Sequence, residues 1–243
     1  MDFTTARNNT GTKVTQGNTV AREDLVCMFG VGLDLLDDPE RVSLKQAYLE
    51  ARAKCLLPKD LPLDPYDALS PYLLNRFNGR FIPAGKLELD SWLTPRPEPE
   101  WAELIKPEYY RASLDDNLCQ KVALALKDFI TENILPCVPG LILVDHSLSG
   151  AAIRALSEKY GADAITCIIL DSHFDGIPSR LRSSALKTEF PMPDSYHCGS
   201  FLHYLIEEGS LMAEHLIMIG ASDHPGSPQN PDAFARAYLD YEN

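Results

Sequence analysis

Short apolar runs alternate with helical patterns along residues 25–220, and this alternation constrains the fold more than any other feature of the sequence. The runs are rich in Leu, Ile and Val, as buried parallel strands are, and they cover residues 25–32, 141–144, 164–170 and 215–220. The helical patterns cover residues 39–54, 113–133, 149–160 and 200–208. Repeated strand–helix–strand units predict an α/β fold of three layers, in which helices cover both faces of a parallel sheet.

Prolines interrupt this alternation between residues 57 and 110. They stand at Pro58, Pro62, Pro65, Pro71, Pro83, Pro95, Pro97, Pro99 and Pro107. This density predicts that no long regular element forms here. Aromatic side chains such as Trp92 and Trp101 nevertheless indicate an ordered insertion that packs on the domain. We therefore predict one domain over residues 1–243, with a flexible leader at residues 1–22, this insertion, and a last helix at 231–241.

Composition excludes several classes of protein. The net charge is −13, with no basic cluster to offset it, which opposes a nucleic-acid or anionic-membrane surface and is compatible with a small cationic substrate. No apolar stretch approaches the roughly 20 residues of a membrane helix. The cysteines are scattered without a C-x-x-C pair, which is typical of reduced thiols in the cytoplasm.

Two acidic-histidine motifs carry the chemistry of the sequence. Asp145-His146-Ser147 follows one apolar run, and Asp171-Ser172-His173-Phe174-Asp175 follows the next. Loops beyond the carboxyl ends of parallel strands converge on one crevice, where such sheets bind ligands. Two histidines and three carboxylates there predict a cage for divalent metals such as Mn²⁺. The alternative is an acidic turn without metal, beside a histidine that is hydrogen-bonded at a strand end.

The order of these motifs resembles the ureohydrolase superfamily of arginases, agmatinases and formimidoylglutamases. The resembling features are strand-D-H-S, a helix, strand-D-x-H-x-D, and a histidine ahead of a helix that ends in E-E-G, within residues 141–220. The resemblance implies an arginase-like fold with a binuclear manganese centre. Fe²⁺, Co²⁺ and Ni²⁺ are chemically close alternatives, because oxygen–imidazole sites discriminate weakly.

The resemblance also implies a role for each matching residue. His146 and Asp175 correspond to ligands of the first metal, His173 to a ligand of the second, and Asp171 to the carboxylate that bridges the two. His197 corresponds to a histidine associated with proton transfer, although Cys198 stands where glycine is usual. Two adjacent cations lower the pKa of a shared water, which suits hydrolysis of a poorly electrophilic guanidinium. We take Asp171 and His197 as the catalytic candidates, and we expect Glu207 and Glu208 to be solvated charges.

Two departures from the family pattern shape the functional hypothesis. Leu143-Val144 replaces two glycines, and Asp223-His224 lacks the D-x-D spacing of the family's later metal motif. We therefore expect an arginase-like fold that is incomplete at the C-terminus, whose remaining ligands come from a second arginase-like chain carrying D-x-D, or from a homo-oligomer.

Three function classes stay open. The first is a subunit of a manganese-dependent hydrolase of linear amidines, which are guanidino or formimino compounds, releasing urea or a related amide. The second is a non-catalytic structural or regulatory arginase-like subunit. The third is a metal-dependent deacylase, which the absence of tandem catalytic histidines disfavours.

Overall fold

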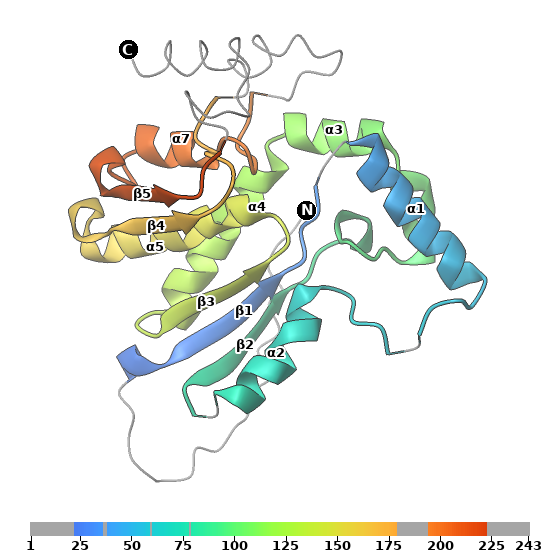
Figure 1. Ribbon diagram of the computed structural model, residues 1–243, viewed down its shortest axis with the longest axis horizontal. Coiled ribbons are helices and arrows are strands. Elements are labelled where there is room, and N and C mark those ends of the chain that lie inside the picture. Colours follow the sequence, from blue (N-terminus) through green and yellow to red (C-terminus); the bar gives the residue numbers. More distant parts are fainter. Residues whose placement is uncertain (1–21, 36–37, 59, 78, 179–193, 223–243) are drawn as a thin grey trace. The chain divides into compact units, whose positions relative to one another are not determined.

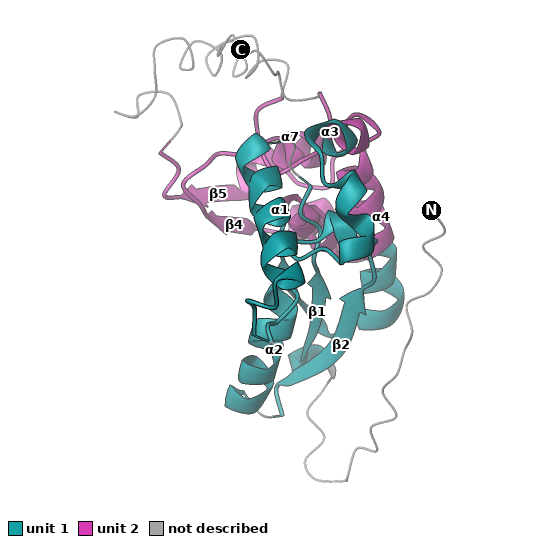
Figure 2. Cartoon of the chain, turned by 90° about the vertical axis from the view of Figure 1, so that its right-hand side faces the viewer, with its two compact units in different colours: residues 1–110, 128–146 teal, residues 111–127, 147–243 magenta. Residues whose placement is uncertain are grey.

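The structure is a computed structural model that describes residues 22–35, 38–58, 60–77, 79–178 and 194–222. The chain forms two compact units, coloured separately in Figure 2. Unit 1 comprises Met1–Tyr110 and Asp128–His146, and unit 2 comprises Arg111–Lys127 and Ser147–Asn243. The predicted leader, apart from Arg22, and the predicted helix at 231–241 lie outside the described residues. The single domain over residues 1–243 stays a prediction.

Unit 1 contains a parallel sheet of strand order β2-β1-β3 (Figure 1). β1 (Val26–Val31) lies in the centre, with β2 (Phe81–Leu87) on one side and β3 (Val138–Leu143) on the other. β1 is buried along almost its whole length, as its apolar composition predicts. The parallel strands and the helices between them confirm the predicted α/β class.

The first helix forms where its start signal predicts. α1 (Pro39–Ala53) begins after Asp38, whose carboxylate accepts a hydrogen bond from the amide of Glu40 at 3.1 Å. Pro39 occupies the first helical position, where its missing N–H costs no hydrogen bond. Val42 and Lys45 are buried on one face of this helix.

The expectation that prolines prevent regular structure is wrong at two places in residues 57–110. α2 (Pro65–Arg76) begins with a proline in its first turn and is capped by Asp64, which accepts from the amide of Asp67 at 3.0 Å. The strand β2 tolerates Pro83 because β2 is an edge strand of its sheet and the pairing register shifts beside this residue. α2 packs against the sheet (Figure 1), so this segment contributes regular elements to unit 1.

The helix predicted over residues 113–133 is interrupted. α3 (Pro107–Asp115) ends before Asn117, and α4 (Leu118–Phe129) follows it and continues as a π-helical turn, Ile130–Ile134. The φ of Asn117 is 54°, in the left-handed region that asparagine adopts more readily than most residues. A single asparagine therefore turns the chain between two helices.

Unit 2 repeats the strand–helix–strand pattern. α5 (Ser149–Tyr160) ends at Gly161, whose φ is +92°, and packs against α7 (Phe201–Glu207). β4 (Cys167–Leu170) pairs in parallel with β5 (Leu216–Ile219), from Cys167 opposite Leu216 to Leu170 opposite Ile219. α5 has the predicted bounds, and the ends of β4, α7 and β5 lie within three residues of their predicted positions. Among the described residues, no helix has the length and apolar character that crossing a membrane requires.

Candidate metal centre

Asp171 follows β4 directly and is held by backbone hydrogen bonds within unit 2. Its amide donates to the carbonyl oxygen of Ile219 at 3.2 Å, which extends the β4–β5 pairing by one residue. Its carboxylate accepts from the amide of His173 at 2.9 Å, so the loop itself orients the side chain. Gly220 has a φ of +97°, and a Cβ added there would lie 3.1 Å from the carbonyl oxygen of Asp171. Glycine at position 220 therefore permits the close approach of the loops that follow β4 and β5.

Asp175 ends the second motif in an unusual backbone conformation. Its φ is 54°, in the left-handed region, and its side chain is buried. Its carbonyl oxygen accepts from the amide of Leu202 at 3.3 Å, which ties the loop to the first turn of α7. Strained backbone of this kind often concentrates at functional sites, where the surroundings hold it in place.

His146 begins the 3-10 turn His146–Leu148, which continues into α5. His146 is the last residue of unit 1, and Ser147 and Leu148, both buried, belong to unit 2. The carbonyl oxygen of Ser147 accepts a hydrogen bond from the hydroxyl of the buried Tyr196. Tyr196 thus fixes the Ser147–Leu148 peptide, one residue beyond His146.

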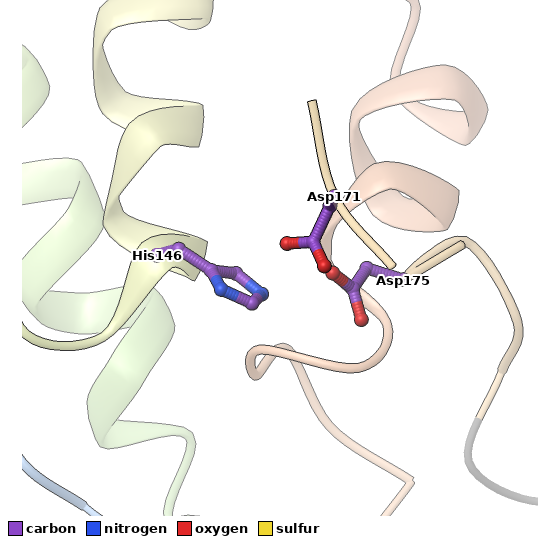
Figure 3. Close-up of side chains that lie close together, drawn as sticks. All are labelled: His146, Asp171 and Asp175. Carbon is purple, nitrogen blue, oxygen red and sulfur yellow. The ribbon is translucent and has the colours of Figure 1, made fainter. Parts of the chain in front are cut away.

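One donor atom from each of His146, Asp171 and Asp175 lies within 4.8 Å of the other two. Figure 3 shows the imidazole and the two carboxylates directed towards one another. An imidazole nitrogen and two carboxylate oxygens form a donor set that suits Mn²⁺ and its divalent neighbours. These side chains therefore fit a metal ion.

His173 and Asp145 lie outside this group of donors. The side chain of His173 is 58% exposed, and its Nδ1 lies 3.4 Å from Oδ1 of Asp171. Asp145 is buried. The structure thus brings together three of the four residues that the family resemblance identifies as metal ligands.

His197, the proton-transfer candidate, is buried in unit 2 just ahead of α7. Its Nδ1 accepts a hydrogen bond from the amide of Gly199 at 3.0 Å. Since Nδ1 acts as an acceptor, a neutral His197 carries its proton on Nε2. The Ser200 hydroxyl braces this turn by donating to the carbonyl oxygen of Ser195 at 2.8 Å.

Comparison with known proteins identifies the family. Residues 99–236, more than half of the chain, match the sequence model of the Arginase family. The chain belongs to the arginase family. This membership, with the parallel strands and helices of both units, confirms the predicted arginase-like α/β fold. No curated protein matches this arginase-family chain.

Solved structures of three proteins resemble the arginase-family chain weakly. Proclavaminate amidino hydrolase from Streptomyces clavuligerus is 18% identical, with a TM-score of 0.38 over 88% of this chain and 56% of that one. A hypothetical agmatinase from Burkholderia thailandensis is 15% identical, with a TM-score of 0.38 over 90% and 56%. Formimidoylglutamase from Bacillus subtilis is 13% identical, with a TM-score of 0.41 over 97% and 62%. The chain thus spans between 56% and 62% of the length of these structures.

A network beside the donor group of this arginase-family chain was missed in the sequence. Glu208 does not extend freely into solvent as expected: its carboxylate binds Arg154, with Nε to Oε1 at 2.6 Å and Nη2 to Oε2 at 3.2 Å. The Arg154 guanidinium lies 4.8 Å from the centre of the Tyr196 ring. The side chain of Glu207 is 61% exposed, as expected, and its Oε1 lies 3.3 Å from Nε2 of His203. The available signal was Arg154 itself, a long cation that stands directly between the apolar residues Ile153 and Ala155 of α5.

Gly150 leaves room for the Tyr196 hydroxyl in this network. A Cβ at Gly150 would stand 2.2 Å from the Tyr196 hydroxyl and 3.3 Å from Leu205. Only a residue without a side chain lets the hydroxyl reach the carbonyl oxygen of Ser147. The glycine three residues after D-H-S is therefore a structural part of the site.

Proposed function

We propose that this chain is a cytoplasmic subunit of a binuclear manganese-dependent hydrolase of linear amidines. The observation that carries the proposal is the convergence of His146, Asp171 and Asp175 within 4.8 Å in a chain of the arginase family. Guanidino or formimino compounds are the proposed substrates, with release of urea or a related amide. Their cationic groups suit a chain of net charge −13.

Each candidate residue has a separate task in this proposal. His146 and Asp175 would hold the first ion, His173 would hold the second, and Asp171 would be a ligand of both. Bound divalent ions supply Lewis acidity and a nucleophile at neutral pH. His197 would take part in proton transfer near the departing amine, with its ring held by the Gly199 amide through Nδ1.

His173 requires a change of side-chain orientation to act as a ligand. Its imidazole is 58% exposed, while its amide already holds the carboxylate of Asp171. Rotation of an exposed side chain costs little free energy compared with formation of a metal–imidazole bond. We therefore retain His173 in the proposed ligand set.

The proposal includes a partner chain. The four candidate ligands that match the family motifs leave part of a binuclear site to be filled, and we propose that a second arginase-like chain with D-x-D, or a second copy, fills it. The β4–β5 sheet supports an association surface, because large apolar side chains are 45% to 77% exposed on one of its faces: Ile168, Leu170, Ile217 and Ile219. Exposed apolar patches often mark protein–protein contacts.

A second candidate is a non-catalytic structural or regulatory arginase-like subunit. The position of His173 outside the donor group favours it, because three donors leave the second ion without an imidazole. This subunit would keep the fold and associate with a catalytic chain.

Metal analysis and a substrate panel distinguish the two candidates. The chain is purified with its untagged partners, its metal content is measured, and urea or ammonia release is followed with guanidino and formimino compounds. We expect bound manganese and hydrolysis, both lost in His146→Ala and retained in the exposed control Asp163→Asn. A folded, metal-free and inactive complex supports the second candidate instead. The binuclear assignment fails if His173→Ala leaves metal content and activity unchanged.

A further inference from the structure

A cavity of about 120 Å³ lies in unit 1, apart from the residues of the candidate metal centre. It opens at the carboxyl ends of two adjacent parallel strands, because its lining includes Gly32, directly after β1, and Glu88, directly after β2. Parallel sheets bind ligands at this edge. Gly32 adds no side chain to the cavity, and the Asp64 carboxylate passes 3.4 Å from the place where a Cβ would stand.

Most charges that line the cavity already neutralise one another. Lys86 binds Asp64 at 3.1 Å and also Asp67 at 2.9 Å. Glu98 binds Arg52 at 2.6 Å. These pairs occupy the cavity's ammonium group and two of its carboxylates.

Two charges of opposite sign are left over. Arg96 is half-buried and lines the cavity, and Glu88 is exposed on the same lining. Neither forms an ion pair with another side chain in the described part of the protein. Arg96 thus offers a guanidinium, which binds carboxylates in a bidentate manner, and Glu88 offers a carboxylate, which binds ammonium groups.

We propose that this cavity binds a small zwitterionic amino acid, with its carboxylate on Arg96 and its ammonium group on Glu88. A simple anion fits less well, because Asp64, Glu88 and Glu98 also line the cavity. A simple cation would leave Arg96 without a partner and would meet Lys86 as well. A molecule with both charges satisfies the two free groups at once, and the small volume limits its side chain.

Calorimetric titration of the full chain tests the proposal. The chain is first treated with chelator, so that an amino acid cannot bind through a metal ion. The probes are glycine, alanine and glutamate, with acetate and methylamine as the separate halves of the zwitterion. We expect saturable binding of at least one amino acid at millimolar concentration or below, and affinity at least about tenfold weaker for acetate and for methylamine. Equal binding of acetate overturns the zwitterion assignment, and absence of amino-acid binding overturns the site.

Substitutions of Arg96 and Glu88 test whether the amino acid binds in this cavity. Arg96→Gln and Glu88→Gln should each weaken amino-acid affinity by about tenfold or more, since each removes one charge-assisted contact. Arg80→Gln and Glu108→Gln are the controls, because both side chains are exposed and lie outside the cavity lining. Thermal melts of all four variants establish that they are folded. Unchanged affinity in Arg96→Gln, with the fold intact, would reject this cavity as the binding site.

Discussion

The hydroxyl of Tyr196 donates a hydrogen bond to the carbonyl oxygen of Ser147, the residue directly after His146. The Tyr196 ring is buried, with Arg154 placed over it, and Arg154 is fixed in turn by Glu208. Tyr196 also directly precedes His197. One side chain therefore links the turn of a candidate metal ligand to the segment of the candidate proton donor.

Replacement of this hydroxyl tests whether it positions the site. Tyr196→Phe keeps the ring and leaves the Ser147 carbonyl oxygen without its donor, so we expect a loss of about 1–2 kcal/mol in the free energy of unfolding. We also expect weaker metal retention on dialysis, because the turn that holds His146 loosens. Urea denaturation and metal analysis measure the two effects. Tyr160→Phe, at a 53% exposed tyrosine, should change neither quantity; equal behaviour of the two variants would refute the positioning role.

Sequence patterns predicted those helix and strand ends that depend on residues close by in the chain. Pro39 after Asp38 predicted the start of α1, and Gly161 predicted the end of α5 to the residue. The apolar runs before the D-H-S and D-x-H-x-D motifs likewise predicted the strands β3 and β4.

Features that depend on distant partners could not be predicted from the sequence. Pro83 in β2 is acceptable only because that strand lies at a sheet edge, which no local pattern reveals. Glu208 pairs with Arg154, 54 residues earlier, and nothing near Glu208 in the sequence indicates this partner. The exposure of His173 also follows from the conformation of its loop rather than from its motif.

A buried ion pair makes unit 1 sensitive to substitution at Lys45. Its Nζ lies 3.2 Å from Oδ2 of Asp34 and 2.9 Å from the Asp34 carbonyl oxygen, and both side chains are at least nine-tenths buried. Lys45→Met leaves Asp34 charged and unpaired, so we expect a loss of about 3 kcal/mol in the free energy of unfolding. The double variant with Asp34→Asn should recover part of this loss. Lys54→Met, which removes an exposed pair with Glu50, should cost less than about 0.5 kcal/mol.

The same lysine should make the stability of the protein depend on pH in the alkaline range. Burial lowers the pKa of Lys45, with the nearby Asp34 acting in the opposite direction. Between this lowered pKa and the ordinary lysine value of about 10.4, the unfolded chain binds more protons than the folded chain, so the Lys45 contribution to stability rises with pH. The stability of the wild type relative to Lys45→Met should therefore increase through this alkaline window. A difference that is flat or falling with pH would contradict the lowered pKa.

Alanine substitutions at two glycines with positive φ distinguish the effect of backbone strain on stability from the effect of disturbing the donor group. Gly220→Ala would place a Cβ 3.1 Å from the Asp171 carbonyl oxygen, whereas Gly209→Ala, at a φ of +77°, would meet nothing within 4 Å. Both should lose about 1 kcal/mol in stability from the left-handed backbone. Only Gly220→Ala should also reduce metal retention, because it moves Asp171. Equal metal content in the two variants would show that the position of Gly220 does not affect the donor group.

Asp175 allows the metal role to be tested with little change in structure. Asparagine adopts the left-handed conformation as readily as aspartate, so Asp175→Asn keeps the φ of 54° while removing the charge. We expect metal affinity to fall by about tenfold or more, because the amide oxygen is a weaker ligand for hard cations. Melting in the presence of chelator measures the effect of the substitution on folding separately from its effect on metal binding. Asp163→Asn, at an exposed aspartate of unit 2, is the matched control. Unchanged metal affinity in Asp175→Asn would remove this carboxylate from the proposed ligand set.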